Sequence, residues 1–128
     1  MNKEFIPYEQ ALELKELGFD EGYYFARYAD SANLIPREEE DGWAWHLTKS
    51  ANAPLYQQVF RWFRENYDLF GCIDLQACSP SHWFIRIDKI EINDYLYHSE
   101  DENVKYNTYE EAELACLKKL IETVKQKL

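Results

Sequence analysis

The chain has 128 residues, a length typical of one domain, and its 46% hydrophobic content can supply a core, so we predict a single domain over residues 1–128. Its 24 acidic and 14 basic side chains give a net charge of −10, which disfavours direct binding to a phosphate backbone. No window approaches the roughly 18 apolar residues of a membrane helix, and no apolar signal-peptide core follows Met1, so we expect a cytoplasmic protein without a membrane partner.

The first predicted helix runs from Pro7 to about Leu17. Proline suits the first helical position because the amide that it lacks would have no helical partner there. Gly18 can then adopt the left-handed conformation that ends many helices. Phe19 is placed to pack back on Leu14, which is the hydrophobic contact of a Schellman motif.

Two or three strands are predicted next. Residues 22–29 form the first, and Leu34-Ile35 begin a return strand that Pro36 confines to an edge or an end. After an acidic loop, residues 43–48 alternate between aromatic or apolar residues and small or polar ones, which predicts a further strand.

The second predicted helix begins at Pro54 and runs to about Tyr67. Its large apolar residues fall on one arc of roughly 160° at helical spacing, which predicts burial on two sides. They are Leu55, Tyr56, Val59, Phe60, Trp62, Phe63 and Tyr67.

A hairpin is predicted from residues 70–77 and 83–92, with Ser79-Pro80-Ser81 at its turn. The large apolar residues change parity along the second arm, so we expect a bulge or break near Asp88-Lys89. Residues 94–97 continue the arm or form another short strand, and residues 104–106 are a possible edge strand.

The last predicted helix extends from Thr108 to Leu128. Thr108 can cap the first amides, and Glu111 can reach back to the Thr108 amide as in a capping box. Lys125 and Lys127 fall in the last turn, where the helix dipole favours cations.

This order of elements predicts an α+β fold, in the order α-ββ-α-ββ(β)-α. We expect a mainly antiparallel twisted sheet of about four to six strands, with three helices packed on it.

Three stretches of the chain, LKELGFDE (14–21), FRWFRE (60–65) and YEEAELACLKKLIE (109–122), resemble a group of short uncharacterised proteins of phages and mobile elements in gut bacteria. The resemblance covers the three predicted helices. It implies a phage or prophage context in the cytoplasm of a bacterial host, and it implies no activity, cofactor or functional residue.

The thiols and imidazoles offer no strong catalytic or metal site. Cys72, Cys78, His82 and His98 form the one Cys/His cluster, but Cys72 and Cys78 are farther apart in sequence than the pairs of structural zinc sites. The turn at residues 79–81 could bring Cys78 beside His82, so an enzyme or metal-dependent protein that uses these two residues is an alternative. No glycine pattern for phosphate binding is present, and we expect no cofactor.

The surplus of aromatic residues favours a protein-binding surface or a homodimer interface on an uncovered sheet face, with unremarkable packing as the alternative. The candidate aromatic anchors are Tyr23, Phe25, Trp43 and Trp45, and the candidate acidic rim is Glu38, Glu39, Glu40 and Asp41. Such a rim would steer a basic partner toward the protein. A narrower alternative is a nucleic-acid mimic, in which the acidic loops 37–41 and 99–103 stand in for phosphates and block a DNA- or RNA-binding protein of the host.

Overall fold

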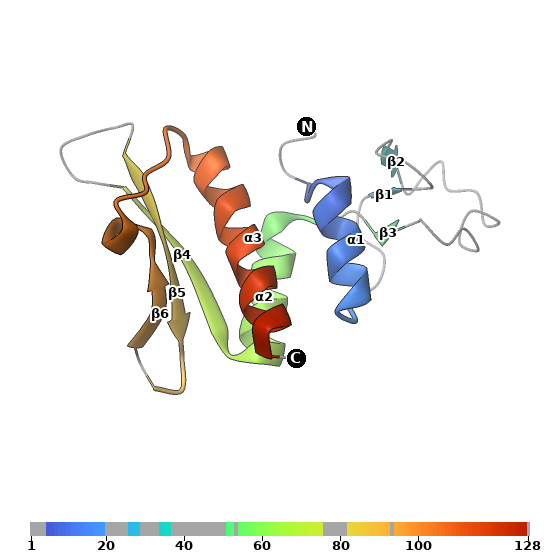
Figure 1. Ribbon diagram of the computed structural model, residues 1–128. Coiled ribbons are helices and arrows are strands. Elements are labelled where there is room, and N and C mark those ends of the chain that lie inside the picture. Colours follow the sequence, from blue (N-terminus) through green and yellow to red (C-terminus); the bar gives the residue numbers. More distant parts are fainter. Residues whose placement is uncertain are drawn as a thin grey trace. The chain divides into compact units, whose positions relative to one another are not determined.

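The computed structural model describes residues 5–19, 26–28, 34–36, 51–52, 54–75, 82–92 and 94–127 (Figure 1). Three helices and antiparallel strands make it an α+β protein, as predicted. The chain divides into two compact units, residues 1–59 and residues 60–128, which we describe in turn. That the whole chain is one domain stays a prediction.

The first helix of unit 1, α1 (Tyr8–Glu16), begins and ends as its sequence predicts. Pro7 precedes it with φ −60°, and Gly18 follows it with φ +97°. The Phe19 amide donates to the Leu14 carbonyl at 2.9 Å, which closes the Schellman motif. Both side chains are buried, so the predicted end of the helix is confirmed.

Among the described residues of unit 1, three short strands form a sheet: β1 (Ala26–Tyr28), β2 (Leu34–Pro36) and β3 (Ala51–Asn52), in the order β2-β1-β3. All pairs are antiparallel, and Pro36 stands at the end of its strand, as predicted. The strand predicted at residues 22–29 is confirmed for residues 26–28. The strand predicted at residues 43–48 lies outside the described residues.

Helix α2 (Tyr56–Tyr67) starts slightly later than the Pro54 predicted from sequence. The Gln58 side chain explains the start, because its Oε1 accepts the Leu55 amide at 2.8 Å and satisfies one of the free donors of the first turn. Val59, Trp62 and Phe63, from the predicted apolar arc, are buried.

Unit 2 contains a second antiparallel sheet, formed by β4 (Leu69–Leu75), β5 (Trp83–Lys89) and β6 (Asp94–His98) in the order β4-β5-β6. The predicted hairpin is confirmed, since β4 and β5 pair along seven residues from Leu69↔Lys89 to Leu75↔Trp83. The described strands therefore form two three-stranded sheets, and the predicted single sheet of four to six strands is not confirmed.

The change of parity in the second arm is explained by where β5 ends. A register shift does occur between Ile87 and Asp88, next to the predicted bulge, but its extra residue is Leu96 of β6, and β5 itself keeps an unbroken register with β4 as far as Lys89. Ile90 and Ile92 lie beyond the end of β5, in the turn at residues 90–92, where they are 45% and 60% exposed. They are turn residues rather than strand residues of opposite parity.

Strand β6 continues into a short 3-10 helix, η4 (Ser99–Glu102), which replaces the predicted acidic loop. Ser99 is fully buried, and its hydroxyl accepts the Ile85 amide at 2.9 Å where β6 leaves the sheet. The possible edge strand at residues 104–106 is a single bridge, in which Tyr106 and Trp83 exchange two backbone hydrogen bonds of 2.9 Å.

Helix α3 (Tyr109–Lys127) is capped almost as predicted. The Thr108 hydroxyl accepts the Glu111 amide at 3.1 Å. The Glu111 carboxylate accepts the amide of Asn107, at 3.3 Å, instead of the Thr108 amide that the capping box predicted.

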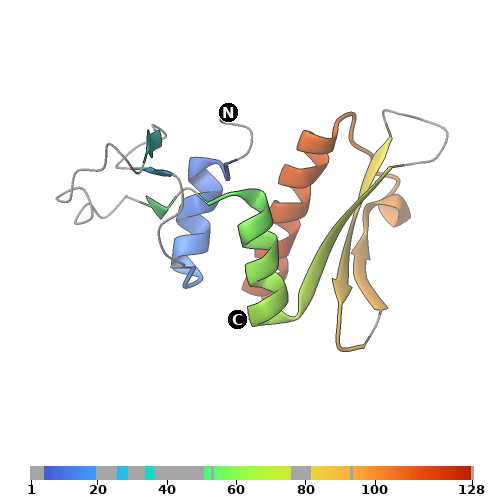
Figure 2. The ribbon, with the colours of Figure 1, turned by 180° about the vertical axis from the view of Figure 1, so that it is seen from behind.

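Helix α3 packs along one side of the sheet against β4 and β5 (Figures 1 and 2). Ile85 and Ile87 of β5 are buried, as are Cys116 and Leu120 of the helix. The approach is closest at Gly71 of β4, where a Cβ atom would stand 2.9 Å from Cys116 Sγ and 3.2 Å from Leu120 Cδ1. The helix can reach this distance because the strand has no side chain there.

Gly71→Ala should therefore destabilise the protein by about 1–3 kcal/mol, the usual cost of overpacking a core. Cys116→Ala removes the sulfur that the new methyl group meets, so the double variant should lose less than the two single losses together. Urea unfolding of the four proteins measures this coupling.

Gly18→Ala is the matched control for the Gly71 cycle. It strains the backbone at φ +97°, and a Cβ atom there meets nothing within 4 Å. Its cost should simply add to that of Cys116→Ala. If the stability losses of Gly71→Ala and Cys116→Ala were also additive, the described packing would be contradicted.

Candidate binding face on the three-stranded sheet

The register of unit 2 determines which side chains lie on the sheet face away from α3. Directly paired residues of antiparallel strands point to the same face, and alternate residues along a strand point to opposite faces. Gly71 and Ile87 mark the face that α3 covers. The other side, which we call the open face, carries Phe70, Cys72, Asp74, Phe84, Arg86, Asp88, Tyr95 and His98.

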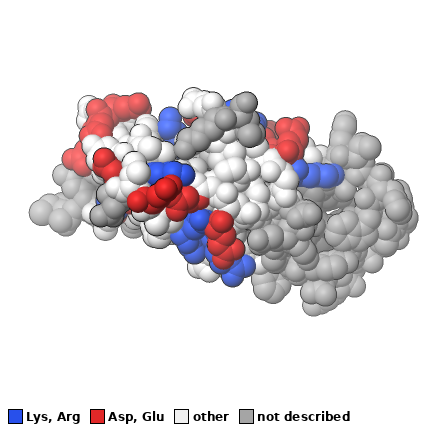
Figure 3. Space-filling view, turned by 90° about the horizontal axis from the view of Figure 1, so that it is seen from below, with Lys and Arg blue, Asp and Glu red and all other residues white. Residues whose placement is uncertain are grey.

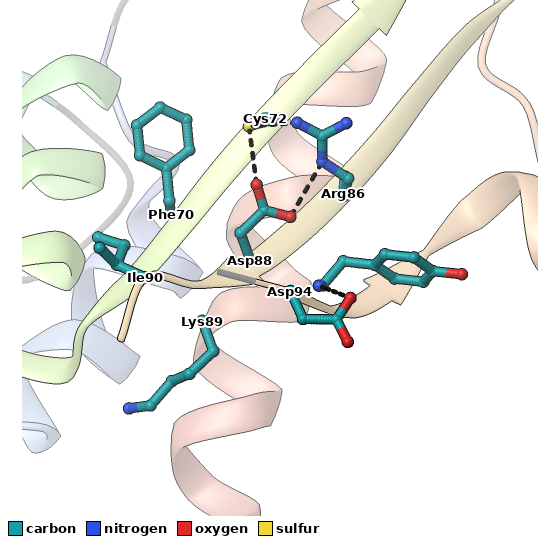
Figure 4. A pocket seen from close by; sticks show the side chains of 8 residues that line it. Phe70, Cys72, Arg86, Asp88, Lys89, Ile90 and Asp94 are labelled. Atoms are coloured by element: carbon teal, nitrogen blue, oxygen red, sulfur yellow. Dashed lines mark hydrogen bonds and ion pairs between the residues drawn. The ribbon is translucent and has the colours of Figure 1, made fainter. Parts of the chain in front are cut away.

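Arg86 lies at the centre of the open face, between two carboxylates and a thiol. Its Nε is 3.0 Å from Asp88 Oδ1, and its Nη1 is 3.6 Å from Asp74 Oδ2. Its Nη2 donates to Cys72 Sγ at 3.6 Å, and this sulfur lies 3.9 Å from Asp88 Oδ2 (Figure 4). Partial burial works against the charged form, but Asp88, Cys72 and Asp74 outweigh it and raise the pKa of Arg86 above its ordinary value.

Aromatic rings surround this polar centre. Phe70 and Tyr95 are 39% and 47% exposed. The His98 ring lies 5.8 Å from the Tyr95 ring and 6.4 Å from the Phe84 ring, between centroids. Together with Cys72, Arg86 and Asp88, Phe70 and Tyr95 line a depression of about 470 Å³ that Lys89, Ile90 and Asp94 complete (Figure 4).

The thiols of the described residues are not activated nucleophiles. Burial raises the pKa of Cys72, which the nearby Arg86 only partly opposes. Cys116 is buried under α3, and burial raises its pKa well above the ordinary value. At neutral pH both remain thiols, whereas a catalytic cysteine needs its thiolate. Cys78, the sequence-predicted nucleophile, lies outside the described residues, and His82 is half-buried next to the start of β5.

No metal cluster of three or more His, Cys, Asp or Glu side chains occurs in the part of the chain that the structure describes. Cys72 and His98 share the open face, but Arg86 stands between them in the register. His98 Nδ1 already accepts the Glu100 amide at 3.1 Å. His98 therefore caps η4, and this hydrogen bond occupies its Nδ1 atom.

An acidic turn, residues 99–103, adjoins the open face. Glu100, Asp101 and Glu102 are exposed, while Ser99 and His98 fix the backbone beneath them. On the other side of β6, the Tyr97 hydroxyl donates to Glu102 Oε2 at 3.2 Å, and Lys119 of α3 lies 4.3 Å from the centre of the Tyr97 ring. In the view of Figure 3, basic and acidic side chains of the described part are interspersed and form no continuous basic field.

The residues predicted from sequence to mediate binding all lie outside the described residues: Tyr23, Phe25, Trp43, Trp45, Glu38, Glu39, Glu40 and Asp41. The open face of unit 2 was not singled out from sequence. The sequence pattern that could have indicated it is an alternation along β5. There, Trp83, Ile85 and Ile87 alternate with Phe84, Arg86 and Asp88, which indicates that one side of the strand is polar and aromatic.

No protein-family model matches the chain, and comparison with curated proteins and with solved structures gave no significant match. Among the described residues, no helix is both long and apolar enough to span a membrane.

The acidic turn predicts an unusual tyrosine titration. Burial and the hydrogen bond to Glu102 raise the pKa of Tyr97 to about 12. Because the neutral phenol is favoured in the folded state, its contribution to stability is complete below the unfolded pKa of about 10 and is lost as the pH rises through 12. The stability of the protein should fall faster than that of Tyr97→Phe over this interval.

Difference absorbance titration of the protein against Tyr97→Phe isolates this one phenol. Glu102→Gln should lower its pKa only in part, because burial is the larger cause. An ordinary pKa near 10 for Tyr97 in the unsubstituted protein would show that the turn does not close over the ring.

Proposed function

We propose that this chain is a small acidic regulatory protein that acts by binding another protein through the open face of the β4-β5-β6 sheet. One observation carries the proposal: α3 occupies one face of the sheet, whereas the other exposes Phe70 and Tyr95 around a charged centre. Exposed aromatic side chains around an arginine are the composition of binding hot spots.

The chemistry of the partner follows from the charges around this face. Residues 69–107 carry three basic and seven acidic side chains. Arg86 is neutralised within the face by Asp74 and Asp88, so the remaining field is negative. A partner with an apolar patch and a basic rim complements both features, and its association should be steered electrostatically. The proposed setting is the cytoplasm of a bacterial host, as the phage-like sequence stretches imply.

A second candidate, a nucleic-acid mimic, is supported by the acidic turn. Glu100, Asp101 and Glu102 are exposed on a backbone that Ser99 and His98 hold in place, as a phosphate substitute requires. The sequence-predicted second cluster, residues 37–41, would extend the mimicry. Reversal of both clusters to lysine must then abolish binding to a nucleic-acid-binding protein and its salt dependence, and unchanged affinity would exclude the mimic.

The test of the main proposal is a pull-down with tagged protein from a gut-bacterial lysate, at low and at high salt. Phe70→Ser and Tyr95→Ser should each reduce recovery of the specific partner about fivefold or more, as expected for the loss of a hot spot of more than 1 kcal/mol. Recovery by the unsubstituted protein should fall as salt rises.

Ile92→Ser is the matched control. Ile92 is 60% exposed and lies in the turn after β5, and it is not among the residues that line the depression. Its replacement removes an exposed apolar side chain and should leave recovery unchanged. Equal losses for all three variants, or a partner that binds all of them equally, would refute the proposed face.

A further inference from the structure

The outer edge of β4 carries backbone groups that point away from its own sheet. In β5, the backbone groups of Trp83 bond those of Tyr106, and the Ile85 amide donates to the Ser99 hydroxyl, so the odd-numbered residues of β5 direct their backbone groups toward the β6 side. The even-numbered residues of β5 direct theirs toward β4, where they pair with the even-numbered residues of that strand. The amides and carbonyls of Gly71, Ile73 and Leu75 therefore face outward, and within the described residues no backbone or side-chain group is bonded to them.

The two edges of this sheet differ in how they are protected. Strand β6 has an irregular register, Asp94 Oδ1 accepts the Tyr95 amide at 2.8 Å, and the strand runs into the acidic turn. These are features that keep an edge from pairing with another chain. Strand β4 has an unbroken register over seven residues and contains no proline or lysine. It is an unprotected template for a further strand.

We propose that β4 pairs antiparallel with β4 of a second copy of this chain, about a two-fold axis that places Cys72 opposite Cys72 of the second copy. In this register, the outward groups of Gly71 face those of Ile73 of the second copy, and the reverse pair repeats across the axis. The two sheets become one continuous six-stranded sheet.

Charge complementarity selects this register and this partner. The Arg64 guanidinium lies 5.6 Å from the centre of the Phe70 ring, at one end of the β4 edge. The proposed register sets Asp74 of the second copy directly opposite Phe70, within reach of that guanidinium. Asp74 would then lie between this guanidinium and Arg86 of its own chain, whose Nη1 is 3.6 Å from Asp74 Oδ2. The ion pair occurs twice because of the two-fold symmetry, an arrangement that an unrelated strand provides only by coincidence.

The same register covers an exposed apolar side chain. Leu75 is 47% exposed at the far end of β4, whereas Leu69 is buried. Pairing sets Leu75 beside Leu69 of the second copy, on the face that α3 covers. The exposed Leu75 side chain would thus be part of an interface rather than an isolated apolar residue on the surface.

The register can be tested through Cys72 itself. Opposed residues that are not hydrogen-bonded to each other have Cα atoms about 4.5 Å apart, within the range of a disulfide. In a Cys78→Ser/Cys116→Ser variant, diamide should take up the two thiol hydrogens and leave a Cys72–Cys72 disulfide between copies. Denaturing gels without reductant should show a dimer that disappears when Cys72 is also replaced by serine. A soluble dimer that diamide does not cross-link would refute the register.

The interface is tested by sedimentation velocity over a range of concentrations. Ile73→Pro removes an outward amide that the folded chain does not use, and Leu75→Lys puts a charge at the edge. Each should raise the dimer dissociation constant about tenfold or more. Leu75→Lys keeps the test valid if Ile73→Pro fails to fold.

Leu96→Lys is the control on the opposite edge. Leu96 of β6 is 44% exposed, close to the exposure of Leu75, and should tolerate lysine without a change in dimerisation. A monomer at every concentration would overturn the proposal, as would a dimer that Leu96→Lys weakens as much as Leu75→Lys does. Partner binding through Phe70 and Tyr95 is tested separately, by the pull-down, so failure of one proposal is distinguishable from failure of the other.

Discussion

The close approach of α3 to β4 at Gly71 is the constraint on which the structure of unit 2 depends. The room for a Cβ atom at this position is already taken by Cys116 Sγ, 2.9 Å away, and by Leu120. The helix therefore lies flat against the strands, where Cys116 and Leu120 are buried together with Ile85 and Ile87. A side chain at residue 71 would hold the helix off the sheet and expose this core.

Because α3 covers one face of the sheet, the other face must be stable without a covering helix. Its charged residues satisfy one another, since Arg86 bonds Asp88 and lies near Asp74 and Cys72, which lets polar groups remain half-buried on a sheet without a covering helix. Phe70 and Tyr95 then remain as apolar surface on either side. This combination is what a docking face requires: a pre-formed polar centre and aromatic rings that a partner can cover.

Local patterns predicted the described helices and strands well, whereas the predicted single sheet is not confirmed. The Pro7 start and Gly18 end of α1, the Thr108 cap of α3 and the hairpin of β4 and β5 depend on neighbouring residues, so sequence is sufficient for them. The division into two sheets depends on which strands meet, which no local pattern encodes. The aromatic residues predicted from sequence to mediate binding lie outside the described residues, so that prediction stays untested. The open face is hard to predict because a ring on an exposed face and a ring in a core look alike in sequence, and only the register separates Phe84 from Ile85.

Helix α3 covers one face of the β4-β5-β6 sheet and leaves the other accessible, and the Cys116 and Cys72 thiols report on these two faces. The most direct measurement is the rate of N-ethylmaleimide modification of Cys72 and Cys116 in dilute native protein with Cys78 replaced by serine. We expect slow but measurable modification of Cys72, since its pKa is raised, and modification of Cys116 only as fast as the protein unfolds. Modification of Cys116 at the rate of Cys72, or equal protection of both thiols, would contradict this arrangement of the two faces.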